Sequence, residues 1–90
     1  MVMRQIRKLP GNYLSTEVDG ELILVHGDTG AFFALEKVGL DIWRKLDEDG
    51  DLEIITQRIE REYDVATDEC QQSVEAFADQ LAGAGFAEYV

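Results

Sequence analysis

The sequence predicts a small α+β domain that begins with an antiparallel meander of three strands and continues with three helices. Three short segments have the apolar content of strands, namely residues 13–18, 21–26 and 31–35. The pair Asp19-Gly20 separates the first two segments, and the turn Gly27–Gly30 separates the last two. Glycine and aspartate favour the tight turns that join neighbouring antiparallel strands. The three strands are therefore expected to pair in chain order.

The hydrophobic period changes directly after the third strand. Apolar residues then recur at three- and four-residue spacing, which predicts helices over about 36–47, 52–63 and 67–82. Asp51 and Thr67 are expected to cap the second and third helices. The expected core-facing residues are Val38, Gly39, Ile42, Trp43 and Leu46, then Leu52, Ile55, Ile59 and Tyr63, then Cys70, Val74, Phe77, Leu81 and Ala84. Three strands followed by three such helices make the predicted domain winged-helix-like.

One domain accounts for nearly the whole chain of 90 residues. Residues 1–12 show no clear period and contain Pro10-Gly11, so we expect a flexible N-terminal arm or a short lead-in. Residues 13–90 contain no repeat or linker and are expected to form the single domain. Residues 86–90 form an apolar tail that should pack back on the sheet or the first helix.

The charge balance argues against nucleic acid as a partner. The chain carries 19 acidic and 8 basic residues, for a formal net charge of −11, and its basic residues are not clustered. Binding to a phosphate backbone requires clustered lysine and arginine. The acidic surface therefore predicts solubility and encounter with basic partners rather than nucleic-acid binding.

We expect a cytoplasmic protein that does not enter a membrane. A single cysteine, Cys70, rules out an internal disulfide and suits a reducing compartment. The longest apolar runs are far too short to cross a bilayer. No apolar segment follows the basic N-terminal residues, so no secretory signal is predicted.

No pattern in the sequence predicts a catalytic residue, a metal site or a cofactor. The acidic run 47–51 resembles a calcium loop, but the required glycine and glutamate positions hold Leu52 and Arg58. His26 and Cys70 are the only histidine and cysteine, too few for a structural zinc site. His26 is expected at the surface, and Cys70 in the core of its helix. We therefore expect a protein that is not an enzyme.

The third strand is the candidate site of recognition. Because side chains alternate along a strand, Phe33 and Leu35 are expected to face the core, and Phe32 and Ala34 the other side. A peptide could add a further strand at this edge. Alternatively, the tail or a second copy of the chain could cover it, or Phe32 could be an isolated surface ring. The third helix carries a face of small and polar residues that could line a shallow groove, namely Gln71, Glu75, Ala78 and Ala82.

Residues 20–46, 52–65 and 73–86 together resemble the PqqD-like proteins, the peptide-recognition domains (RiPP recognition elements) of pathways that modify ribosomally made peptides. The similarity covers roughly residues 14–86. It depends on the order and spacing of the strand ending at Leu35, Val38-Gly39, Ile42-Trp43, Tyr63 before Asp64-Val65, and Leu81 before Gly85-Phe86. Glu36 departs from the family, which prefers asparagine there, and this leaves the capping of the first helix open.

The resemblance implies a domain without catalytic activity or cofactor, to which the leader of a precursor peptide adds antiparallel to the third strand, against the third helix. Carried over by position, the implied peptide-binding residues are Ala31, Phe32, Phe33, Ala34, Gln71, Val74, Glu75, Ala78, Leu81 and Ala82. Glu75 and Asp79 could pair with a basic leader residue, each exposed pair contributing ~0.2–1 kcal/mol.

The implied partners are the precursor leader and separate maturation enzymes, which could be a leader peptidase, a cyclase or a radical SAM enzyme. Trp43 and Val38-Gly39 resemble the PqqD-like proteins of lasso-peptide pathways more than those of quinone-cofactor pathways. Two other functions stay open at this point: a DNA-binding winged helix, and an interaction module that forms a homodimer through the same strand edge.

Overall fold

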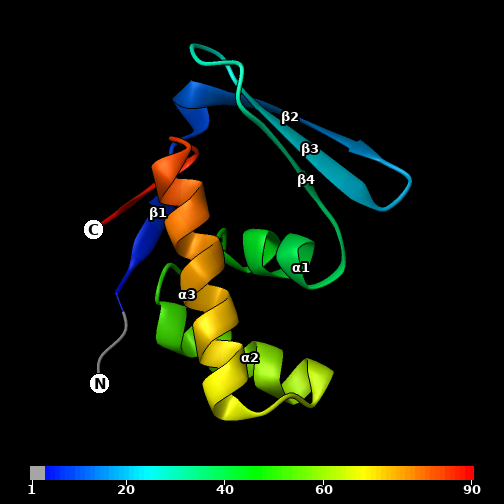
Figure 1. Cartoon of the computed structure of the whole chain (residues 1–90), viewed down its shortest axis with the longest axis vertical. Coiled ribbons are helices and arrows are strands. Elements are labelled where there is room, and N and C mark those ends of the chain that lie inside the picture. Colours follow the sequence, from blue (N-terminus) through cyan, green and yellow to red (C-terminus); the bar gives the residue numbers. More distant parts are fainter. Residues whose placement is uncertain (1–3) are drawn as a thin grey trace.

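The computed structural model describes residues 4–90 and contains the predicted meander and three helices (Figure 1). The strands are β1 (Ile6–Lys8), β2 (Tyr13–Val18), β3 (Glu21–His26), β4 (Phe32–Leu35) and β5 (Ala87–Tyr89), with a 3-10 turn at Pro10–Asn12. The helices are α1 (Lys37–Lys45), α2 (Leu52–Tyr63) and α3 (Thr67–Gly83). Strands β2, β3 and β4 form an antiparallel sheet in that order, and β1 pairs with β5 in a second, two-stranded sheet. The predicted α+β fold is confirmed.

The turn between β2 and β3 sets the register of the meander. Asp19 and Gly20 both have positive φ, 48° and 81°, as a two-residue hairpin turn of the primed type requires. This turn places Leu14 opposite Val25, and β4 continues the same row with Phe32 opposite Val25. Apolar side chains therefore lie side by side across all three strands.

The N-terminal segment is part of the fold, so the prediction of a flexible arm over residues 1–12 is wrong for the residues described. Ile6 of β1 is only 1% exposed, and β1 is antiparallel to β5. The Leu9 N–H also donates to the Phe86 carbonyl at 2.9 Å. Residues 1–3 lie outside the described residues. The two three-residue strands come from opposite ends of the chain, and segments this short carry no readable period.

The C-terminal tail anchors the core beneath the sheet. Phe86 is fully buried, and its ring centroid lies 5.0 Å from that of Phe33 and 6.0 Å from that of Tyr13. The predicted packing of the tail on the sheet is thus confirmed at Phe86, whereas β5 itself pairs with β1.

His26 is buried rather than at the surface, because it sits between the β3–β4 turn and the tail. It is 7% exposed, and its Nδ1 accepts hydrogen bonds from the backbone N–H groups of Asp28 and Thr29. Its ring also packs 6.0 Å from that of Phe86. The imidazole therefore organises the turn that leads into β4.

The helix boundaries follow the predicted caps only in part. Asp51 caps α2 as expected, since its side chain accepts from the Glu53 N–H at 2.9 Å. Thr67 is instead the first residue of α3, where Ala66 occupies the cap position without a side-chain bond. Tyr63 ends α2 at 38% exposure, so the core stripe of α2 stops at Ile59, which is 2% exposed.

Candidate peptide-binding groove

Strand β4 lies at an edge of its sheet and pairs only with β3 within residues 4–90. The His26 N–H donates to the Ala31 carbonyl at 2.8 Å. Because paired residues alternate along an antiparallel ladder, Phe33 and Leu35 must also exchange backbone bonds with β3. The N–H and C=O groups of Phe32 and Ala34 then point away from β3. The outer edge of β4 is thus available to another strand.

The two faces of β4 differ as the sequence predicted. Leu35 is 5% exposed and Phe33 is half-buried, so both contribute to the core side. Phe32 is 67% exposed and Ala34 is also exposed, on the opposite face. The alternation predicted for this strand is confirmed.

An open groove of about 410 Å³ runs between β4 and α3. Its strand side is lined by Phe32, Phe33, Ala34 and Leu35, and its other side by Glu36, Gly39, Phe77 and Gln80. Figure 1 shows β4 as the strand of its sheet that lies towards α3. The groove therefore combines open backbone groups on the strand with a mixed wall, in which the Phe77 ring lies between polar residues.

Gly39 and Phe77 form the contact between α1 and α3 at the floor of this groove. A Cβ built on Gly39 would meet the Phe77 ring at 3.7 Å, an ordinary contact distance. The ring thus lies directly over the glycine, with no side chain from α1 between them. Phe77 was expected in the core stripe, but it is half-buried and Ala78 takes the core position at 2% exposure.

The structure brings three of the predicted site residues to the groove, all of them on the strand. Phe32, Phe33 and Ala34 line it directly. Ala31 precedes β4 and is half-buried, with its carbonyl bonded to His26.

None of the six residues predicted on α3 lines this groove, and the helix side of the peptide-binding site stays a prediction. Val74, Ala78 and Leu81 are at most 2% exposed and belong to the core. The other three predicted residues, Gln71, Glu75 and Ala82, are half-buried on α3 and are also absent from the groove lining.

Glu75 and Asp79 face the second sheet rather than β4. The Tyr89 O–H donates to an Asp79 carboxylate oxygen, and the charge of Glu75 acts on the same phenol. The acidic side of α3 is therefore turned away from the groove. Sequence reasoning did not assign Phe77 and Gln80 to the site. Each directly precedes a predicted residue, Ala78 or Leu81. Because each residue turns an α-helix by about 100°, this shift of one position selects a different face of α3.

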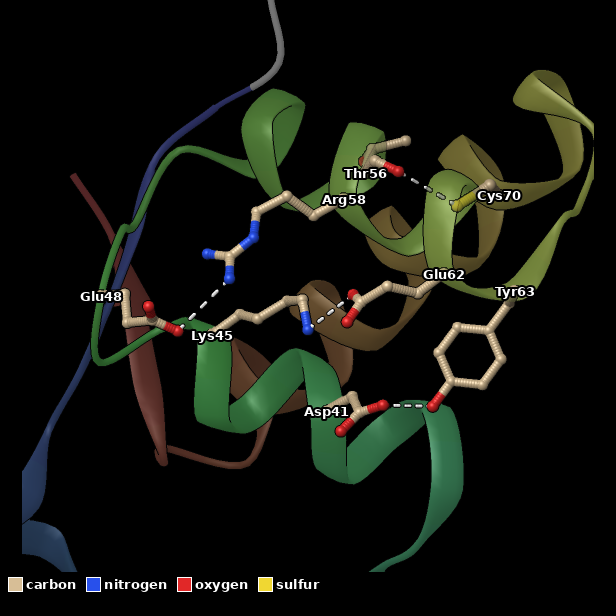
Figure 2. Close-up of polar contacts among 8 residues, drawn as sticks. All are labelled: Asp41, Lys45, Glu48, Thr56, Arg58, Glu62, Tyr63 and Cys70. Carbon is tan, nitrogen blue, oxygen red and sulfur yellow. Dashed lines mark hydrogen bonds and ion pairs between the residues drawn. The ribbon is translucent and has the colours of Figure 1, made fainter.

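Side-chain contacts hold α1 and the turn after it against α2 (Figure 2). Lys45 Nζ lies 2.8 Å from a Glu62 carboxylate oxygen, and the Tyr63 O–H donates to Asp41. An ion pair of 3.6 Å joins Arg58 to Glu48 further along. The first two contacts join α1 to α2, and the third joins α2 to the turn that follows α1.

Burial raises the pKa of the Cys70 thiol, with a smaller contribution from Glu60, so the thiol is held in its unreactive protonated form. Residues 4–90 hold no group of three histidine, cysteine or acidic side chains placed to bind a metal ion. Within the same range, no helix is long and apolar enough to span a membrane.

Comparisons with known proteins support the class that the fold and groove define, a winged-helix-like domain with an open edge strand beside a helix. The family model described as coenzyme PQQ synthesis protein D (PqqD) matches residues 21–87. The chain therefore belongs to the PqqD family, as the sequence motifs indicated.

Two solved structures are similar over almost their whole length. TbiB1 in complex with the TbiA(beta) leader peptide is 30% identical, with a TM-score of 0.81 over 91% of this chain and 94% of that one. Lasso peptide synthetase B1 complexed with the leader peptide is 20% identical, with a TM-score of 0.80 over 92% and 96%. The second likeness shows the fold alone. A search of curated proteins finds no match. Both solved structures contain a bound leader peptide.

Proposed function

We propose that this protein is a non-catalytic adaptor that binds the leader of a ribosomally synthesised precursor peptide and presents it to separate maturation enzymes. The observation that carries the proposal is the open outer edge of β4 beside a groove lined in part by aromatic rings. The leader adds as a fourth strand, antiparallel to β4, and its backbone bonds to the outward groups of Phe32 and Ala34. Alternate leader side chains then enter the groove against Phe77.

Membership of the PqqD family and the leader bound to TbiB1 both support this role. The resemblance of Trp43 and Val38-Gly39 to the lasso-peptide type favours a pathway in which a leader peptidase and a cyclase would receive the peptide. A Kd of about 1 μM or tighter, roughly 8 kcal/mol, is within reach of one added strand with a few buried side chains.

Replacing Ala34 by proline tests the proposed mode of binding. The Ala34 N–H points away from β3, so the change removes a donor that only an added strand would use, and edge strands tolerate proline at such positions. Isothermal titration with the leader of a precursor peptide encoded beside this chain should show affinity at least about tenfold weaker, which is 1.4 kcal/mol.

Ser15→Pro is the matched control, because the same alternation turns the Ser15 N–H outward on β2, at the opposite edge of the sheet. This variant should bind the leader like the unchanged protein. Equal affinity of Ala34→Pro and Ser15→Pro would rule out strand addition at β4. Sedimentation with and without the leader distinguishes leader binding from the alternative, a homodimer that forms through the same edge of β4.

A further inference from the structure

The outer face of the meander, which points away from the helices, is apolar and open to solvent. The pairing of the strands places eight side chains on it, namely Leu14, Thr16, Val18, Glu21, Ile23, Val25, Phe32 and Ala34. Leu14 is 78% exposed, Phe32 67% and Val18 53%. The ion pair of Glu17 with Arg44 shows that the opposite face of β2 is the one turned towards α1. Six of the eight outward residues are therefore apolar side chains that the core does not use.

The outer face is too small to hold a stable partner by itself. Its three strands, about 4.8 Å apart and up to six residues long, span roughly 15 by 20 Å, or about 300 Å². An exposed apolar patch of about this size on a monomer often marks a site of interaction. A specific protein–protein interface, however, buries about 800 Å² on each partner. A partner of the outer face must therefore contact a further surface as well.

A peptide bound at β4 would enlarge the outer face, because it becomes the fourth strand of the same sheet. Residues opposite one another on neighbouring strands point to the same face. Leu14, Val25 and Phe32 already form one row across the meander. The peptide residue opposite Phe32 continues this row, and the residue opposite Ala34 continues the next one. Protein and peptide then present a single surface.

The direction of the added strand places the end of the leader beside this row. Strand β4 runs towards α1, so the C-terminal end of an antiparallel leader leaves the sheet past Phe32. The bond that a leader peptidase cuts lies at that end of the leader. An enzyme seated over Leu14, Val25 and Phe32 would thus be held close to the bond it cuts, and the peptide in its active site would supply the remaining contact.

The charge around the outer face disfavours a second copy of the chain as its partner. Glu21 is the only charged residue among the eight, and Asp19 and Asp28 lie in the turns at the two ends of the meander. Two copies packed face to face would bring these carboxylates together, with a net charge of −11 on each chain. Like charges placed against each other weaken an interface, whereas opposite charges select the partner. The complementary surface is apolar at its centre and bordered by lysine or arginine.

We propose that the outer face of the meander docks the peptidase that receives the leader, through an apolar surface bordered by basic residues. The peptidase contacts Leu14, Val18 and Val25 together with the outward side chains of the bound leader. This proposal rests on the function proposed above. Because the protein and the leader form one surface, the leader raises the affinity for the peptidase, and by linkage the peptidase raises the affinity for the leader by the same factor.

The test uses Leu14→Lys, which places a positive charge at the most exposed apolar position of the outer face. Ser15→Lys is the matched control, because it adds the same charge at the exposed neighbouring residue, whose side chain points to the opposite face. The probe is the purified leader peptidase encoded beside this chain. It is titrated into each variant with and without a saturating leader segment that ends before the cleavage site. Both variants should bind the leader alone equally, because β2 lies at the far edge of the sheet from β4.

We expect the peptidase to bind leader-loaded Leu14→Lys at least about tenfold more weakly than leader-loaded Ser15→Lys. The leader should raise the affinity of the unchanged protein for the peptidase at least about threefold.

Equal affinity of the two loaded variants, or no binding of the peptidase to the loaded unchanged protein, would overturn the docking surface while leaving leader binding at β4 intact. An affinity for the peptidase that the leader does not change would overturn the shared surface. Failure of the unchanged protein to bind the leader would instead overturn the proposed function, and the docking proposal with it.

Discussion

The rings of Phe33 and Phe86 pack edge to face with their centroids 5.0 Å apart, and this contact joins the edge strand to the C-terminal tail. Phe86 is fully buried, while Phe33 also lines the groove. The strand proposed to receive a peptide is therefore fixed from beneath by the core.

Phenylalanines 32 and 33 should have separable roles. Phe33→Ala removes a ring packed on Phe86 and should lower the free energy of unfolding by about 3 kcal/mol. Phe32 is 67% exposed, so Phe32→Ala should change stability by less than about 0.5 kcal/mol. Urea denaturation of both variants measures the difference. If Phe33→Ala were as stable as Phe32→Ala, the assigned faces of β4 would be reversed.

The two glycines near the end of α3 should respond to alanine with opposite signs. Gly85 has φ +82°, and a Cβ there would lie 2.8 Å from Nε2 of His26. Gly85→Ala should therefore lower stability by about 2 kcal/mol or more. A Cβ on Gly83 would meet nothing within 4 Å, so Gly83→Ala should stabilise the helix by roughly 0.5–1 kcal/mol. Thermal melts of the pair test the packing of His26, and a harmless Gly85→Ala would contradict it.

Alkaline pH should weaken the fold through Tyr89. Burial, assisted by the hydrogen bond to Asp79, raises the pKa of this phenol from 10.0 to about 12. The folded state thus holds the proton more tightly than the unfolded state does. The resulting stability is fully present below pH 10 and is lost as the pH rises through about 12.

Denaturation midpoints at a series of pH values, with Tyr89→Phe as the control, measure this loss. The unchanged protein should lose more stability above pH 10 than the variant. Parallel curves for the two proteins would contradict the assigned contact with Asp79.

The DNA-binding alternative makes a distinct prediction about salt. With a net charge of −11, the protein should not retard any duplex in a gel, even at low ionic strength. A retarded complex whose affinity falls steeply as salt is raised would favour that alternative over leader binding.

The meander could be predicted from sequence because each of its signals is local. Asp19-Gly20 encodes a tight turn, and the change of period after Leu35 marks the passage from strand to helix. The N-terminal strand could not be predicted, because β1 forms by pairing with β5, about 80 residues away, and by bonding to the segment just before α2. Contacts between the ends of a chain leave no local pattern.

The candidate site was likewise predictable from sequence only in part. The strand residues could be predicted because side chains along a β-strand point alternately to its two faces, so the faces are known once one residue is assigned. The helix side depends on which of two adjacent faces of α3 meets β4, and Phe77 and Ala78 differ by only one helical step. The apolar Phe77 was a plausible core residue, but packing against Gly39 holds it at the groove. Only the tertiary arrangement places the smaller Ala78 in the core.

Amide hydrogen exchange at Phe32 and Ala34, measured by NMR with and without the leader peptide, tests the central proposal most directly. Strand addition predicts that both amides exchange at least about tenfold more slowly in the complex, while the outward Ser15 amide of β2 is unchanged. A saturating leader that leaves the exchange of Phe32 and Ala34 as fast as in the free protein would contradict the account.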